Sequence, residues 1–137
     1  MSDQSNVEIV NTWFKEVWNE GRQDTIDRLL DDNCVVTGLV PGEINSCQHF
    51  KDFQKQIFES YSNFRIEVLN TISSGNEVAS LVKCRGLHNN TGREVDFNAC
   101  FIGKITNGKI SEAYNVVDFL SPLLQTGIID EGQLEQF

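Results

Sequence analysis

The sequence predicts an α+β domain shaped like a cone, in which helices pack against a strongly curved, mainly antiparallel sheet. Two observations indicate this fold class. Apolar residues recur with a helical period in the N-terminal half, and from Phe64 onward they alternate with a period of two. Turn signals at Gly75, Gly92 and Gly108 then separate the alternating runs. Helices that precede an antiparallel meander are typical of the α+β class, whereas parallel α/β folds interleave the two.

Three helices are expected in the N-terminal half. Ser5 begins a capping box, and the first helix runs from there to near Gly21 with a broad apolar stripe. The stripe consists of Ile9, Val10, Trp13, Phe14, Val17 and Trp18. Because it contains both tryptophans of the chain, this helix must face a large apolar space. A short second helix is expected over residues 24–30, and a third over residues 47–61.

Five strands are expected, over residues 34–40, 64–74, 77–88, 93–105 and 109–118. A long sheet that wraps around helices encloses a pocket between the two layers. We expect a single domain over residues 1–137, with an ordered core of about 5–127 and a looser acidic tail.

Composition places the chain among ordinary globular proteins, with 39% apolar and 23% charged residues. The net charge of −9 argues against binding of nucleic acid or of anionic membrane surfaces, because both attract basic patches. The N-terminus lacks a basic start followed by an apolar run. No apolar run approaches the ~20 residues of a membrane span, so we expect a cytoplasmic protein.

The four cysteines are Cys34, Cys47, Cys84 and Cys100. They lie far apart, form no CxxC pair and are accompanied by only two histidines. Such a pattern is typical of neither a zinc site nor a disulfide framework. We therefore expect no metal, and we interpret the cysteines as small and mostly buried apolar residues.

Asp118 is the first candidate for a functional residue, because it stands where the last strand ends among apolar neighbours. Alternation along the strand places it on the same face as Tyr114. A carboxylate in such surroundings is costly unless another group pairs with it or the protein uses it. Burial in a cavity would raise its pKa above the usual ~3.9, which suits a general base or acid. The alternative is structural, since an Asp at a strand-to-helix junction is often an N-cap.

The cavity that would hold Asp118 is expected between the two layers. We expect it to be bounded by Trp13 and Val17 of the first helix, Phe53 and Ile57 of the third helix, and Tyr114. His88, at the far end of a neighbouring strand, is a second candidate for a catalytic or ligand-binding group. Its alternative is a histidine at a loop edge that makes an ordinary hydrogen bond.

Three groups of residues resemble one known family. They are Val17–Gly21 (VWNEG), Arg85–His88 (RGLH) with Thr91–Val95 (TGREV), and Gly108–Glu112 (GKISE) with Asp118 and Leu124–Gly127 (LQTG). In this order and spacing they are similar to the motifs of the SnoaL-like polyketide cyclase and ester cyclase family. This family belongs to the nuclear transport factor 2-like superfamily, with the cystatin-like cone fold that ketosteroid isomerases share. The resemblance reaches from about residue 7 to 129.

The resemblance implies a cofactor-free acid/base cyclase that acts on an apolar carbonyl compound in an enclosed pocket. Asp118 matches the catalytic aspartate, which would deprotonate a carbon next to a carbonyl and allow an aldol ring closure. His88 or Tyr114 would orient the substrate. Two alternatives stay open. One is a non-catalytic module of the same fold that binds a small apolar ligand or dimerises, and the weaker one is an epoxide hydrolase-type reaction.

A homodimer is expected, with the outer face of the sheet as its interface. Helices cover only one side of the predicted sheet, and Leu81, Ile102, Ala113 and Val117 are expected on exposed strand faces. Exposed apolar patches of this kind usually mark association between chains.

Overall fold

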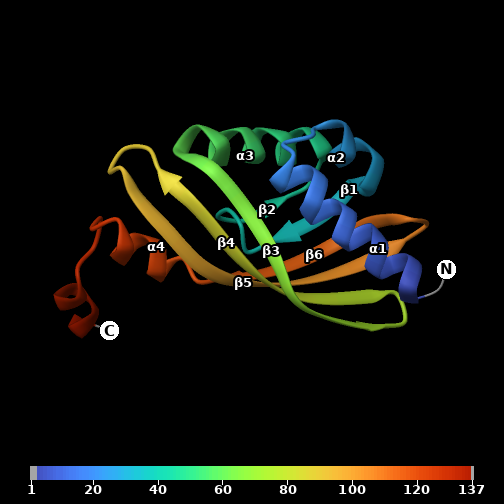
Figure 1. Ribbon diagram of the computed structural model, residues 1–137. Coiled ribbons are helices and arrows are strands. Elements are labelled where there is room, and N and C mark those ends of the chain that lie inside the picture. The colour runs from blue at the N-terminus through green and yellow to red at the C-terminus, as the bar shows by residue number, and fades with distance from the viewer. Residues whose placement is uncertain (1–2, 137) are drawn as a thin grey trace.

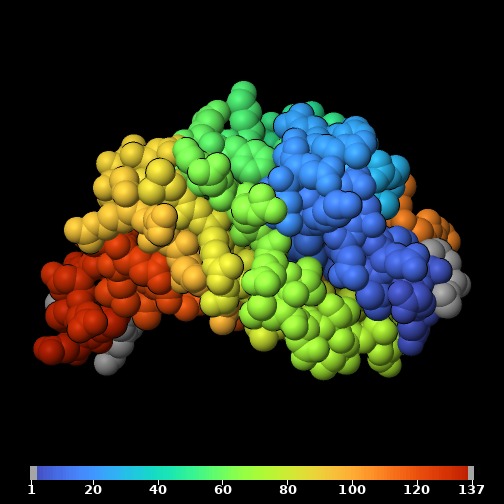
Figure 2. Space-filling model, viewed as in Figure 1, coloured from blue at the N-terminus to red at the C-terminus, as the bar shows by residue number. Residues whose placement is uncertain are grey.

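A computed structural model describes residues 3–136 of the chain, with the side chains of residues 3–135. Helices gather on one side of a long curved sheet, and the C-terminal segment lies at the end of the molecule opposite α1 (Figures 1 and 2). The helices are α1 (Asp3–Trp13), its continuation as the π-helix η1 (Phe14–Asn19), α2 (Asp24–Leu29), α3 (Cys47–Ser60), α4 (Leu120–Gln125) and the 3-10 helix η2 (Glu131–Gln136).

The strands are β1 (Leu30–Thr37), β2 (Glu43–Ile44), β3 (Tyr61–Ser74), β4 (Glu77–His88), β5 (Arg93–Thr106) and β6 (Lys109–Val117). They form one six-stranded sheet in the order β2-β1-β6-β5-β4-β3. The β1–β6 pair is parallel and the other four pairs are antiparallel. The predicted α+β class is therefore confirmed, as is the curved, mainly antiparallel sheet.

Two element boundaries differ from the predicted ones. Helix α1 begins at Asp3, so Ser5 lies inside the helix and not at its cap. Strand β1 begins at Leu30, four residues before the expected start at Cys34. Leu30 already pairs with β6, but an irregularity follows before the next pair at Val35. The polar residues within that irregularity hide the strand from a search for alternating apolar residues.

A β-bulge in β6 reverses the side-chain alternation that the sequence suggested. Lys104 pairs with Glu112, yet the next pair is Ile105 with Ile110, so β6 contains one extra residue, Ser111. Ile110 consequently faces the helices together with Ala113 and Val117. The expectation that Ala113 and Val117 lie on the outer face is wrong, because an extra residue exchanges the two faces of every residue beyond it.

The hydrophobic core lies between the helices and the inner face of the sheet. Trp18 is at its centre and makes edge-to-face contacts with Phe50, Phe53, Phe58 and Phe64, at ring-centroid distances of 5.6 to 6.0 Å. Such contacts add to the stabilisation from burial alone. Within residues 3–136, no helix has both the length and the apolar character that a membrane crossing requires.

Candidate functional site

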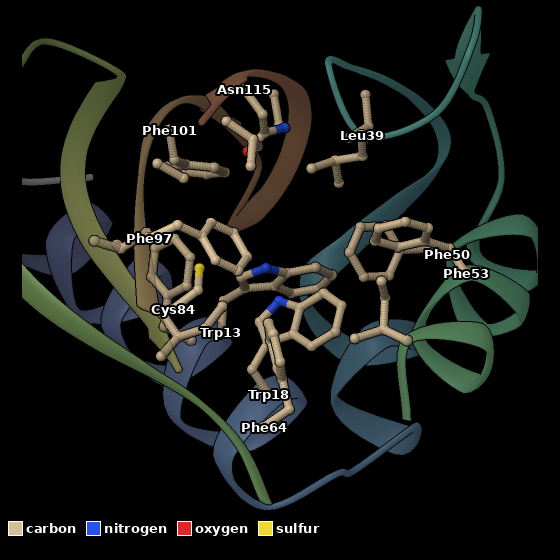
Figure 3. A pocket seen from close by; sticks show the side chains of 18 of the residues that line it. Trp13, Trp18, Leu39, Phe50, Phe53, Phe64, Cys84, Phe97, Phe101 and Asn115 are labelled. Atoms are coloured by element: carbon tan, nitrogen blue, oxygen red, sulfur yellow. The ribbon is translucent and has the colours of Figure 1, made fainter. Parts of the chain in front are cut away.

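A cavity of ≈ 120 Å³ lies between the helix layer and the inner face of the sheet. Its walls consist almost entirely of aromatic and aliphatic side chains, which η1, α3, β5 and β6 contribute from opposite sides (Figure 3). Among the predicted ligand-binding residues, the walls include Trp13, Phe53 and Ile57. The cavity is therefore an apolar space with an aromatic and aliphatic lining, and it is partly open to solvent and not fully enclosed.

The π-helix η1 determines how the two tryptophans enter this cavity. On an α-helix, residues five apart point ~140° away from each other. In η1 the backbone N–H of Glu20 donates to the carbonyl of Lys15, five residues earlier, at 3.1 Å. This wider turn brings residues five apart to nearly the same side. Trp13 and Trp18 consequently both line the cavity.

Two side-chain amides, the half-buried Asn19 and the buried Gln54, hold η1 in this form. The Asn19 side chain donates to the carbonyl of Ile66 at 2.9 Å and accepts from the N–H of Ile66 at 2.7 Å, so it joins the helix end to β3. The Gln54 side chain donates to the carbonyl of Val17 at 2.8 Å. Val17 was expected to line the cavity, but it is fully buried outside the lining, and its contribution is this backbone carbonyl.

The loop after β1 closes one side of the cavity. Gly38 has a φ of +89°, and a Cβ atom there would lie 1.8 Å from the backbone oxygen of Asn115. Only glycine permits this approach of the loop to β6. The Asn115 side chain donates to the carbonyl of Thr37 at 3.1 Å and lines the cavity together with Leu39. Asn115 was not predicted from the sequence, and Tyr114, its outward-facing neighbour, was predicted in its place.

Asp118 does not point into the cavity, and the expectation that it does is wrong. Its side chain is exposed. One carboxylate oxygen accepts the backbone N–H of Ser121 at 3.1 Å and the other accepts the Ser121 hydroxyl. These are the contacts of a helix cap at the start of α4, the structural alternative. The β6 bulge is the physical reason, because it turns Asp118 outward.

Tyr114 and His88 also lie outside the cavity lining. Tyr114 is on the outer face, where its hydroxyl donates to the Glu112 carboxylate at 3.2 Å. That neighbouring negative charge raises the pKa of Tyr114. The His88 ring packs against Tyr61 with centroids 5.3 Å apart, and its Nδ1 lies 2.9 Å from the Thr91 hydroxyl. His88 therefore does not line the cavity, but it packs against Tyr61, which does.

The segment from Phe119 into α4 forms one wall of the cavity. Phe119 and Pro122 line it from this side. The Gln125 side chain accepts from the backbone N–H of Asp96 at 2.9 Å and donates to the carbonyl of the same residue at 2.8 Å. The β5 residues before Ala99 have no partner on β6, so the Gln125 amide supplies hydrogen bonds to this edge of β5. The predicted strand over residues 93–105 is longer than the one over residues 109–118, and this difference indicates that part of the longer strand needs another hydrogen-bond partner.

The titratable groups in the walls stay protonated at neutral pH. Burial raises the pKa of the Cys84 thiol to about 12 and also raises the pKa of the Tyr61 hydroxyl. Among the described residues, no three His, Cys, Asp or Glu side chains come together in the manner of a metal site. The cavity is consequently better suited to holding an apolar molecule than to accepting a proton from one.

Comparison with known proteins identifies the family. The sequence profile of the SnoaL-like polyketide cyclases matches residues 8–126. The chain belongs to this family. The predicted resemblance is thus confirmed over nearly the whole chain. No curated protein matches the chain significantly.

Solved structures show how widely this family's fold is shared. A proposed SnoaL-like polyketide cyclase from Jannaschia sp. CCS1 has a TM-score of 0.84 at 18% identity, covering 93% of this chain and 94% of its own. A proposed polyketide cyclase from Bacillus cereus ATCC 10987 has a TM-score of 0.83 at 22% identity, covering 94% and 87%. A protein from Catenulispora acidiphila DSM 44928 with the ketosteroid isomerase-like fold, solved in complex with trimethylamine, has a TM-score of 0.79 at 12% identity, covering 88% and 92%.

Proposed function

We propose that this protein binds a small apolar molecule, about the size of a single ring, inside the cone. The observation that carries the proposal is the cavity of ≈ 120 Å³ with its apolar, largely aromatic lining. An apolar cavity of ~150 Å³ in another protein takes up benzene. A void of similar volume and lining offers the same driving force, which is removal of the ligand's apolar surface from water.

The construction of the walls supports this proposal. Trp13, Trp18 and Phe53 belong to one network of edge-to-face contacts around Phe50, so their rings are already in place before a ligand enters. A preformed site loses little conformational entropy on binding. The related Catenulispora protein, which holds the small molecule trimethylamine in its complex, supports a small ligand within this fold.

Acid/base cyclisation, the reaction after which the family is named, is a second candidate. It is favoured by the position of Asp118 between Val117 and Phe119, which both line the cavity. To act as the base, the Asp118 carboxylate would have to leave its contacts with Ser121 and turn toward the cavity. In the present structure that carboxylate is engaged with Ser121, so ligand binding is the function that the geometry supports best.

A pair of alanines allows a matched test of binding. Ala99 lines the cavity from β5, and Ala79 lies on the outward-facing side of the adjacent β4. We expect styrene to bind wild type saturably in isothermal titration calorimetry. Ala99→Leu should abolish binding because the new side chain fills the cavity, whereas Ala79→Leu should leave it unchanged. Absence of saturable binding to wild type, or equal binding by the two variants, would overturn the proposal.

A further inference from the structure

The indole N–H groups of Trp13 and Trp18 are polar groups in the apolar cavity that the protein itself does not use. The two side chains are only 4% and 7% exposed. Neither N–H has a hydrogen-bond partner among residues 3–136. Figure 3 shows both indole rings in the middle of the lining side chains, turned into the cavity. An indole N–H can only donate, and a buried one usually finds an acceptor.

The two indoles belong to one aromatic cluster in the cavity wall. Both rings pack edge-to-face on the same Phe50 ring, at centroid distances of 4.9 and 6.0 Å. Their common direction depends on the π-helix η1, which Asn19 and Gln54 hold in place. Single-turn π-helical segments occur frequently at functional sites. A regular α-helix over the same residues would turn one of the two indoles away from the cavity.

We propose that the Trp13 and Trp18 indoles donate hydrogen bonds to a neutral carbonyl oxygen of the ligand. This inference rests on the proposed binding function and names the ligand's chemical class, a single-ring ketone or aldehyde. A carbonyl oxygen has two lone pairs and can accept from either indole or from both. The remaining ring of the ligand then contacts the aromatic walls.

A neutral acceptor fits the surroundings better than an anion does. The cavity-lining residues that the structure describes include no Lys, Arg or His side chain. The chain as a whole carries a net charge of −9. A buried anion without a paired cation is strongly disfavoured. A ketone requires only hydrogen-bond donors, which the two indoles supply.

The test uses two ligands of the same shape, acetophenone and α-methylstyrene, which differ in a carbonyl oxygen against a methylene group. The protein contains two tryptophans, so a 15N-labelled sample gives two indole N–H signals in a proton–nitrogen correlation spectrum. We expect acetophenone to move at least one indole proton signal strongly downfield, as a new hydrogen bond does. The methylstyrene should bind without such a shift.

Variants measure the same effect as an affinity. Trp13→Phe and Trp18→Phe each remove one N–H and keep an aromatic ring. The variant of each indole whose signal moves should weaken acetophenone binding by about 2- to 10-fold more than methylstyrene binding, the range expected for one neutral hydrogen bond. The change in methylstyrene affinity measures the apolar contact that is lost when an indole is replaced by the smaller phenyl ring. Tyr114→Phe, on the outer face, is the control and should change neither affinity.

The outcomes separate the two proposals. If both ligands bind but shift the indole signals alike, and the variants lower both affinities equally, the carbonyl assignment is overturned while the binding function stands. If neither ligand binds wild type, both the proposed binding function and the proposed hydrogen bonds from the indoles to a carbonyl oxygen are overturned. If a variant fails to fold, the wild-type spectra with the two ligands still test whether an indole N–H donates to the carbonyl oxygen.

Discussion

The two faces of strands β4, β5 and β6 differ in what they present, although the same backbone carries both. The inner face presents aromatic and small apolar residues to the helices and forms the cavity. The outer face carries two apolar rows that cross the three strands. One row consists of Leu81, Cys100 and Val116, and the other of Ala79, Ile102 and Tyr114.

Charged pairs of both signs flank these outer rows. Lys83 pairs with Asp96 on one side, and Lys104 pairs with Glu112 on the other. The inner face is thus shaped for packing around a small molecule, whereas the outer face is an apolar strip with a polar rim. Coverage by the helices, and not strand sequence alone, is therefore the reason that only the inner face forms a cavity.

Thiol chemistry should show the largest difference between the two faces. Cys100 is exposed on the outer face, while burial on the inner face raises the pKa of Cys84 from 9.0 to about 12. The thiolate fraction of Cys84 at pH 8 is then about a thousandfold lower than that of an unperturbed thiol. Reaction with Ellman's reagent in dilute solution should give one fast thiol per chain.

The control for this prediction is Cys100→Ser, which should remove the fast phase; persistence of that phase would contradict the assignment.

The raised pKa of Cys84 also predicts a pH dependence of stability. The folded state holds the Cys84 proton more tightly than the unfolded chain does. The contribution of this protonated thiol to the free energy of unfolding is therefore fully present below pH ~9 and is lost as the pH rises toward 12. The alkaline loss should be smaller in Cys84→Ala.

Removing one aromatic ring from each face should change stability very differently. Trp18→Ala deletes the centre of the inner aromatic cluster and should lower the free energy of unfolding by about 3–5 kcal/mol. Tyr114 is 48% exposed, so Tyr114→Ala should stay within about 0.5 kcal/mol at low protein concentration. Urea unfolding measures both values. Similar losses for the two variants would mean that the faces do not differ as described.

The outer apolar rows should mediate a homodimer. Val116 is 76% exposed near the C-terminal end of β6, and Ile102 and Leu81 lie on the neighbouring strands. We expect light scattering at micromolar concentration to give twice the 15.5 kDa mass of one chain. Ile102→Lys should halve that mass with the fold intact by circular dichroism. A single-chain mass for wild type would exclude this interface.

The smallest effect is expected for Asp118→Asn. Asn caps a helix about as well as Asp, so stability should change by no more than about 0.5 kcal/mol. Because the side chain points away from the cavity, ligand affinity should be unchanged. Calorimetry with the bound ligand and thermal unfolding measure the two quantities. A ~10²–10⁴-fold loss of turnover on a verified substrate would instead support the cyclase candidate.

Local patterns in the sequence determined most of the fold. The alternation of Val95, Phe97 and Phe101, together with the Asn107-Gly108 turn, fixes strands and hairpins through contacts between neighbours in the chain. The broad apolar stripe of the first predicted helix likewise places the two tryptophans in the core. Trp13, Phe53 and Ile57 could be assigned to the inner space because their helices have a single apolar side.

Only the tertiary structure decided which residues meet in the site. The extra residue Ser111 reverses the faces of β6, so Asn115 enters the cavity while Tyr114 and Asp118 leave it. The π-helical turn that directs both indoles inward depends on Asn19 and Gln54, which come from η1 and α3. The bulge appears only in the pairing of β6 with β5, and the π-helical turn is held by contacts with β3 and α3. Local sequence patterns do not contain these contacts between distant segments, and for this reason the fold was predictable while the chemistry of the site was not.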